Sequence, residues 1–243
     1  MSNRTHATAL ALAVALTVST QSFAEVPYYA RTTIDAGLTG AAFVVAGNVV
    51  DNPRPEIVAS AFGQFVFGPQ GPVWPSAGQV MLYTSTQSGH APNGQITGWN
   101  KTEIVGLADA IKAPNRPALA DINCDGRPDV IVPGGYFFDT FIGNALGSLS
   151  WWENKGNGKR WVRHNIVTGS PFAYHSAIHA DIDGDGRKDI VSVAEQAGNP
   201  QIATDDIVEL QLFKGNGNGT FQPAVKLADG GGGLIEAYDV NKD

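Results

Sequence analysis

The feature that most constrains the fold is a short acidic loop that recurs along the chain. In residues 181–189, aspartates occupy the first, third, fifth and ninth positions, and Gly186 occupies the sixth. Carboxylates this close together repel one another unless a cation lies among them, and oxygen ligands on a flexible loop suit Ca²⁺. Residues 190–193, which are rich in β-branched side chains, follow directly and predict a strand.

The loop has three further copies of different completeness. Residues 121–129 repeat it with Asn123 as a neutral oxygen ligand, and residues 239–243 begin another copy. Residues 48–56 are an eroded copy, because Glu56 stands at the ninth position and Pro53 at the sixth, so we expect weak or no metal binding there. A unit that recurs every 58 to 73 residues indicates a repeat architecture.

The predicted calcium ligands are the side chains at positions one, three, five and nine and the backbone carbonyl at position seven. They are Asp121, Asn123, Asp125, Arg127 and Asp129; Asp181, Asp183, Asp185, Arg187 and Asp189; and Asp239, Asn241 and Asp243 in the incomplete copy. An EF-hand would need a glutamate at position twelve, where Val132 and Ser192 stand. A second alternative, that these clusters are only turns, is disfavoured by their repetition before apolar runs.

These motifs carry a family resemblance. The pattern D-x-[DN]-x-D-G-x-x-D-[IV]-[IV] resembles the FG-GAP and VCBS repeats of β-propellers, including the head of integrin α-subunits. Residues 212–221 also resemble the glycine-rich hairpin of VCBS repeats. The resemblance covers most of the chain after about residue 41, and it implies a propeller fold and calcium binding.

We therefore expect an all-β fold, a β-propeller of four-stranded antiparallel blades, with about three blades and the start of a fourth. The innermost strands are predicted at residues 41–47, 116–120, 177–180 and 234–238, the second at 56–61, 129–133 and 189–194, the third at 79–84, 148–153 and 208–213, and the fourth at 99–105, 161–167 and 221–227. The repeats lie near residues 41–107, 116–168, 175–228 and 233–243. Because the chain stops inside a metal loop, we expect a C-terminally truncated fragment of a longer protein.

Residues 1–24 have the features of a signal peptide. Arg4 supplies a positive charge, residues 9–18 form an apolar region too short to span a membrane, and residues 22–24 fit a small-x-small cleavage motif. The mature chain, residues 25–243, is therefore expected to be secreted or periplasmic, without a membrane span. A net charge of −7 without basic clusters argues against nucleic-acid binding, and the single Cys124 excludes an internal disulfide framework.

Long connections join the second and third strands of each predicted blade, at residues 62–78, 134–147 and 195–207. In a four-stranded meander they emerge on the rim opposite the acidic loops. The aromatic and histidine side chains that we predict to contact a ligand there are Phe65, Trp74, Tyr136, Phe137, Phe141, Tyr174 and His175. Aromatic faces stack on sugars and anchor protein partners, but such residues can also form small loop cores.

No recognisable catalytic motif accompanies these features, and no catalytic residue is predicted. His164, His175 and His179 leave a transition-metal site as an alternative. Residues 151–154, with Trp161 and His164, resemble a hairpin of aldos-2-ulose dehydratase propellers. The favoured hypothesis is an exported calcium-binding propeller that serves as a binding or adhesion module for a glycan or protein ligand. The alternative is the propeller portion of a secreted carbohydrate-active lyase or isomerase.

Overall fold

The computed structural model of the chain describes residues 31–68, 71–73 (backbone only), 76–86, 96, 98–136, 146–198, 204–238 and 240. The chain divides into the units Met1–Thr32 and Thr33–Asp243, and the described strands all lie in the second unit. Within the described residues there is no α-helix, and the one helical turn is the 3₁₀ turn η1 (Leu107–Asp109).

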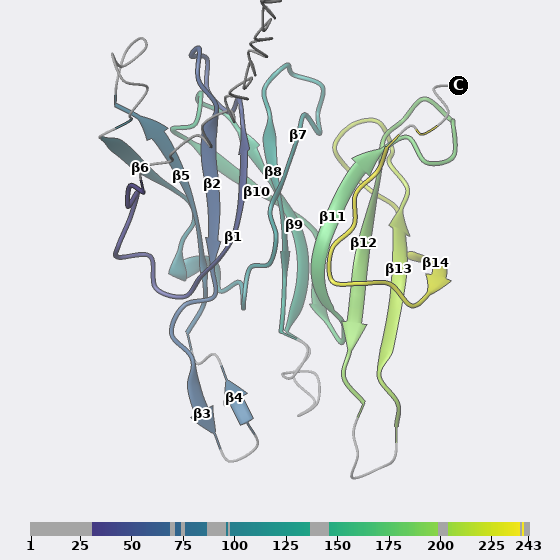
Figure 1. The fold of residues 1–243 in the computed structure, drawn as a ribbon. Coiled ribbons are helices and arrows are strands. Elements are labelled where there is room, and N and C mark those ends of the chain that lie inside the picture. Colours follow the sequence, from purple (N-terminus) through teal and green to yellow (C-terminus); the bar gives the residue numbers. More distant parts are fainter. Residues whose placement is uncertain are drawn as a thin grey trace, which may run out of the picture. The chain divides into compact units, whose positions relative to one another are not determined.

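Three four-stranded antiparallel sheets form the unit, each a meander in chain order (Figure 1). The first contains β1 (Ala41–Gly47), β2 (Glu56–Ala61), β5 (Gln79–Ser85) and β6 (Trp99–Val105). The second contains β7 (Ala118–Ala120), β8 (Asp129–Gly134), β9 (Gly147–Asn154) and β10 (Trp161–Ser170), and the third β11 (Ala173–Ala180), β12 (Asp189–Gln196), β13 (Ile207–Phe213) and β14 (Val225–Asp229). These sheets confirm the predicted four-stranded blades, and we call them blades 1, 2 and 3.

Proline explains two of the differences between the predicted and the observed strands. The innermost strand of blade 2 begins at Ala118 rather than at residue 116, and Pro117 before it has no N–H to give to a ladder. The fourth strand of blade 3 begins at Val225 rather than at residue 221. Pro223 interrupts it, and Phe221 forms only an isolated bridge with Gly215.

The predicted strand at residues 234–238 is wrong. This segment follows a run of glycines and forms no strand. The backbone N–H of Ile235 donates to the hydroxyl of Ser176 at 3.0 Å, so a side chain of β11 receives the hydrogen bond instead of a neighbouring strand.

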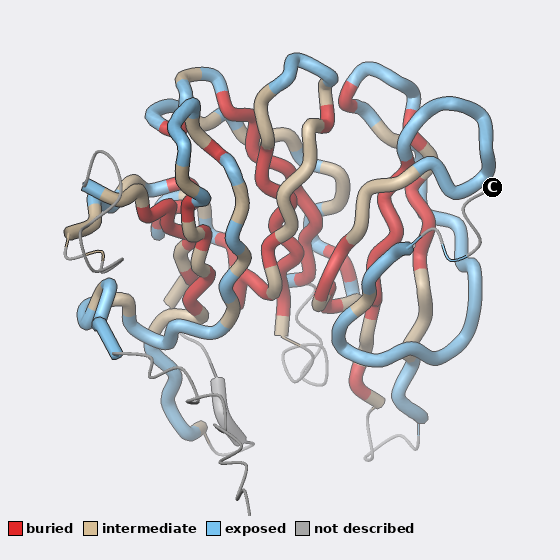
Figure 2. The backbone as a smooth tube through the Cα atoms, turned by 45° about the horizontal axis from the view of Figure 1, so that its top comes forward, coloured by how far each residue is buried: buried red, intermediate tan, exposed pale blue. Residues whose placement is uncertain are grey.

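Two hydrophobic clusters join the blades. One contains Val58 and Leu82 of blade 1 with Val130 and Trp152 of blade 2, and the other contains Ile131 and Trp151 of blade 2 with Ile190 and Phe213 of blade 3. Blade 2 therefore uses alternate residues of each strand on its two faces, as a sheet between two others requires. Figure 2 shows the buried segments running along the strands, with exposed segments mainly in the connections.

Two rims follow from the meander order. The acidic loops connect β1 to β2, β7 to β8 and β11 to β12, and they share a rim with the turns that join β9 to β10 and β13 to β14. Hydrogen bonds between loop and turn show this, such as the one from Gly215 N to Asp189 Oδ1 at 2.8 Å. The short hairpin of β3 (Val66–Gly68) and β4 (Gly71–Val73) lies in the connection from β2 to β5, on the opposite rim (Figure 1).

Candidate metal centre

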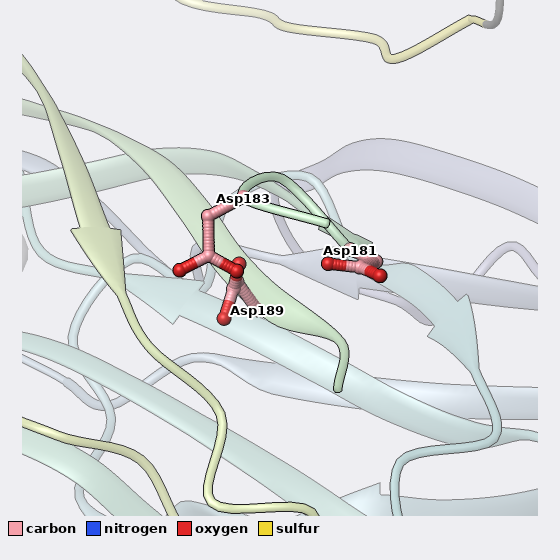
Figure 3. A group of neighbouring side chains, drawn as sticks. All are labelled: Asp181, Asp183 and Asp189. Atoms are coloured by element: carbon pink, nitrogen blue, oxygen red, sulfur yellow. The ribbon is translucent and has the colours of Figure 1, made fainter. Parts of the chain in front are cut away.

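The loop at residues 181–189 brings three carboxylates together. One oxygen from each of Asp181, Asp183 and Asp189 lies within 4.8 Å of the others, and Figure 3 shows Asp183 and Asp189 next to each other with Asp181 nearby. The turn is built around Asp181, whose Oδ1 accepts from Gly184 N at 2.9 Å and whose Oδ2 accepts from Gly186 N at 2.9 Å. Gly184 and Gly186 have φ of +74° and +82°, which glycine tolerates without strain.

The loop at residues 121–129 repeats this conformation. Asp121 accepts from Asp125 N at 3.0 Å and from Gly126 N at 2.9 Å. Gly126 has φ of +84°, and Cys124 at the fourth position has φ of +59°, where Gly184 stands in the other loop. Position four therefore has a positive φ in both loops, which was not predicted from the sequence although Gly184 was a signal for it.

The ninth-position aspartates anchor each loop to the sheet. Asp129 is 0% exposed, and it accepts from Ile122 N at 3.0 Å and from Asn154 N at 2.9 Å. Asp189 is 1% exposed, and it accepts from Ile182 N at 3.2 Å as well as from Gly215 N. Asp129 therefore ties its loop to the end of the third strand β9, and Asp189 ties its loop to the turn that follows the third strand β13; the sequence did not predict these contacts.

The seventh-position arginines clamp the same two segments. Arg127 donates through Nε to Asn154 O at 2.8 Å, and its guanidinium also pairs with Asp125. Arg187 donates through Nε to Gly215 O at 3.2 Å and pairs with Asp185. Only the backbone carbonyls of these arginines were predicted to take part in the site. Their side-chain contacts were not predicted, although Arg54 stands at position seven of the eroded loop as well.

In the eroded loop, backbone N–H groups and the Asn52 side-chain amide donate to the carboxylate of Glu56. Glu56 is buried, and its Oε2 accepts from Val49 N at 2.8 Å and from Val50 N at 3.0 Å. Its Oε1 accepts from the Asn52 side-chain amide at 2.6 Å. Both carboxylate oxygens of Glu56 thus have donors from the loop itself, and weak or no metal binding at residues 48–56 stays a prediction.

The pKa values of two aspartates, one in each intact loop, shift in opposite directions. Burial raises the pKa of Asp129 to about 6, and the charges of Asp125 and Asp121 add to this rise. A hydrogen bond from Lys214 instead holds the pKa of Asp183 below its usual value. The neighbouring carboxylates around Asp129 and the lysine beside Asp183 both indicate that a positive charge is favoured near these side chains.

The donor set fits a hard cation. Every side chain at positions one, three, five and nine offers a carboxylate or amide oxygen, which calcium prefers, and no thiolate or imidazole belongs to this set. Asp239, Asn241 and Asp243 of the incomplete copy lie outside the described residues.

Of the three histidines considered for a transition metal, His164 and His175 pair with glutamates, whereas the buried Nδ1 of His179 has no hydrogen-bond partner among the described residues. The His164 ring stacks on Trp151 with centroids 4.1 Å apart, and its Nε2 lies 3.0 Å from Glu153 Oε2. His175 Nε2 lies 2.7 Å from Glu195 Oε2, and the His179 ring meets the edge of Phe221. Burial lowers the pKa of His179 to about 4, with Lys188 adding to the effect.

The described residues that were predicted to contact a ligand on the opposite rim differ in their exposure. Phe65 is 51% exposed and packs edge-to-face against Phe67, which is 80% exposed, and Tyr136 is half-buried. Tyr174 is only 2% exposed and donates its hydroxyl to Gln211 at 3.0 Å, so it is a core residue and the prediction for it is corrected. Trp74, Phe137 and Phe141 lie outside the described residues.

Comparison with known proteins adds one finding. Residues 137–192 match the sequence model of the FG-GAP-like repeat, a stretch that includes the loop at 181–189. No curated protein matches the chain. Within the part of the chain that the structure describes, no helix is both long and apolar enough to cross a membrane.

Proposed function

We propose that this FG-GAP repeat β-propeller-like protein is an exported module that holds Ca²⁺ in its loops at 121–129 and 181–189 and binds a glycan or protein ligand on the opposite rim. The observation that carries the proposal is the carboxylate cluster of Asp181, Asp183 and Asp189 in a loop whose conformation recurs in blade 2. Asp239, Asn241 and Asp243 are proposed to begin a further site of the same kind.

Calcium is proposed to act structurally. Each loop joins the first two strands of its blade, and a buried aspartate ties it to the end of the third strand in blade 2 and to the turn after the third strand in blade 3. A cation among the side chains at positions one, three, five and nine would offset the repulsion between them. Because a cation that binds only the folded chain stabilises it by mass action, calcium should raise the free energy of unfolding.

The opposite rim is the proposed ligand surface. Phe65 directly precedes β3 and Phe67 lies within it, and this exposed pair provides apolar ring surface of the kind that sugars and protein partners contact. Phe67 is an addition to the residues predicted from the sequence. Trp74, Tyr136, Phe137, Phe141 and His175 stay in the proposal, and Tyr174 leaves it.

The structure gives a packing explanation for the hairpin that suggested a carbohydrate-active enzyme. Trp151 and Trp152 are 3% and 4% exposed and lie in the two interblade clusters. Trp151 also donates Nε1–H to Gly219 O at 3.0 Å. We therefore do not propose an enzymatic function.

A glycan array and a partner capture, both with the exported protein, test the ligand surface. The double variant Phe65→Ala/Phe67→Ala should weaken binding by about 2 kcal/mol or more if these rings are hot spots, with an unchanged melting temperature. The matched control, Asp185→Ala on the far rim, should lower the melting temperature in calcium and leave ligand affinity unchanged. Unfolding of the double variant would show that the rings form a loop core, and the ligand-surface proposal would fail.

Export has a separate test. The proposed signal peptide ends at residue 24, so the N-terminal residue of protein recovered from the periplasm or medium should be Glu25. Mass spectrometry of the recovered chain measures this directly, and retention of the first 24 residues in the cytoplasm would contradict export.

A further inference from the structure

One position on the β-ladder differs in charge between the two intact loops. The register pairs Val130 with Trp152 and Ile190 with Phe213, so the next residues, Glu153 and Lys214, come opposite the ninth-position aspartates. Each of the two also contacts the third position of its loop. Asn123 Nδ2 lies 2.9 Å from Glu153 Oε1, and Lys214 Nζ lies 2.5 Å from Asp183 Oδ2.

In blade 3 this position holds a cation that belongs to the protein. The ammonium of Lys214 occupies Oδ2 of Asp183, while Oδ1 accepts from Asp185 N at 3.3 Å. Asp183 is one of the three residues whose oxygens cluster in this loop. A divalent cation that uses the Asp183 carboxylate must therefore displace the lysine or tolerate its repulsion.

In blade 2 the same position holds an acceptor. An ionised carboxylate can only accept hydrogen bonds. Glu153 therefore orients the Asn123 side chain so that the NH₂ group of Asn123 points toward the Glu153 carboxylate. The Asn123 carbonyl oxygen is then turned into the loop, where it accepts from Asp125 N at 3.1 Å. Glu153 is itself buried and held by Lys155 at 2.5 Å and by His164 at 3.0 Å.

We propose that the side chain opposite the ninth-position aspartate, Glu153 or Lys214, sets the cation affinity of each loop. This inference rests on the proposed calcium binding. Lys214 is a tethered competitor that weakens binding at 181–189. Glu153 is a positioning residue that presents the Asn123 oxygen and strengthens binding at 121–129. The two loops therefore have similar backbones but separately tuned affinities.

Calorimetric calcium titration tests the lysine. In an Asp125→Ala background, which removes a ligand from the other loop, Lys214→Gln should tighten binding at 181–189 by about three- to tenfold. The matched control is Lys226→Gln, which removes a lysine paired with Asp229 on β14 and should leave the affinity unchanged. Equal affinity in the two variants would overturn the role of Lys214.

The glutamate is tested in an Asp185→Ala background. Glu153→Gln should weaken calcium binding at 121–129 by about three- to tenfold, because it removes a charge and lets the amide of Asn123 rotate. Adding Asn123→Asp to that variant restores the charge in a ligand that needs no orientation, so the affinity should recover. Failure of this rescue would assign Glu153 a purely structural role and overturn the proposal for it.

These outcomes separate the inference from the proposed function. Calcium binding by the wild-type chain with no effect of Lys214→Gln or Glu153→Gln would contradict only the tuning. A wild-type chain and Lys214→Gln variant that both fail to bind calcium would contradict the proposed function and the tuning together.

Discussion

At the scale of single residues, Asp129 and Asp189 combine a ligand position with a structural contact. Their place in the motif predicts a metal ligand, and that part could be derived from the spacing alone. Their hydrogen bonds to backbone N–H groups at the end of the third strand or in the turn after it could not, because these depend on how a segment some 25 residues away returns to the loop. Tyr174 shows the same limit, since only the packing of β11 against Phe213 places its ring in the core.

We predict that Asp129→Ala destabilises the protein even when calcium is chelated. The substitution leaves the N–H groups of Ile122 and Asn154 without their acceptor, which should cost about 2 kcal/mol or more of unfolding free energy. Asp125→Ala should change the stability little in chelator, because the Asp125 side chain accepts only exposed hydrogen bonds, from Arg127 and from the Asn123 amide. Urea unfolding in chelator compares the two variants, and equal losses would contradict the anchoring role of Asp129.

At the scale of elements, the strands could largely be predicted because alternation and turn residues are local properties. The exceptions follow prolines at 117 and 223 and the glycine run before residue 234. Contacts between a turn and the neighbouring blade could not be predicted from the sequence. Gly158 approaches Val50 and Leu82 of blade 1, and Gly219 approaches Trp151 of blade 2, each closely enough that a Cβ would clash.

We predict that Gly219→Ala is more destabilising than Gly230→Ala. Both glycines have positive φ, of +79° and +83°, so both substitutions add similar backbone strain. A Cβ at position 219 would lie 2.9 Å from the Trp151 ring, whereas a Cβ at position 230 meets nothing within 4 Å. The difference in unfolding free energy should be about 1–3 kcal/mol, and similar values by thermal or urea unfolding would contradict tight packing between the turn and blade 2.

An ion pair ties the segment before β1 to blade 1, and it predicts a pH dependence. Asp35 accepts from Lys101 at 2.6 Å and from Tyr83 at 2.7 Å, and these contacts, Lys101 first, lower the pKa of Asp35 to about 2. A lowered pKa means that the contribution of Asp35 is complete above about pH 4 and is lost as the pH falls through about 2.

The variant Asp35→Asn should therefore lose stability at neutral pH and show a flatter decline in stability between about pH 4 and pH 2. Asp229→Asn, which removes an exposed pair with Lys226, is the matched control and should follow the wild-type curve. Melting temperatures across this pH range provide the measurement, and parallel curves for Asp35→Asn and the wild type would contradict the role of the ion pair.

At the scale of the whole molecule, repetition was the most informative signal. The recurring acidic loop carried the resemblance to propeller repeats, and this resemblance together with the strand pattern of each unit predicted the four-stranded antiparallel blades. The meander order also predicted that the acidic loops lie on one rim and the long connections on the other. The charge swap between Glu153 and Lys214 was not predicted, since it appears only when the register aligns the two hairpins.

The central claim is that calcium in two acidic loops stabilises this propeller-like module, and thermal unfolding across a calcium titration tests it most directly. The wild-type melting temperature should rise with calcium and fall back when chelator is added. The double variant Asp125→Ala/Asp185→Ala keeps both buried anchors and should lose most of the rise. A wild-type melting temperature that stays constant from chelator to millimolar calcium would contradict the account.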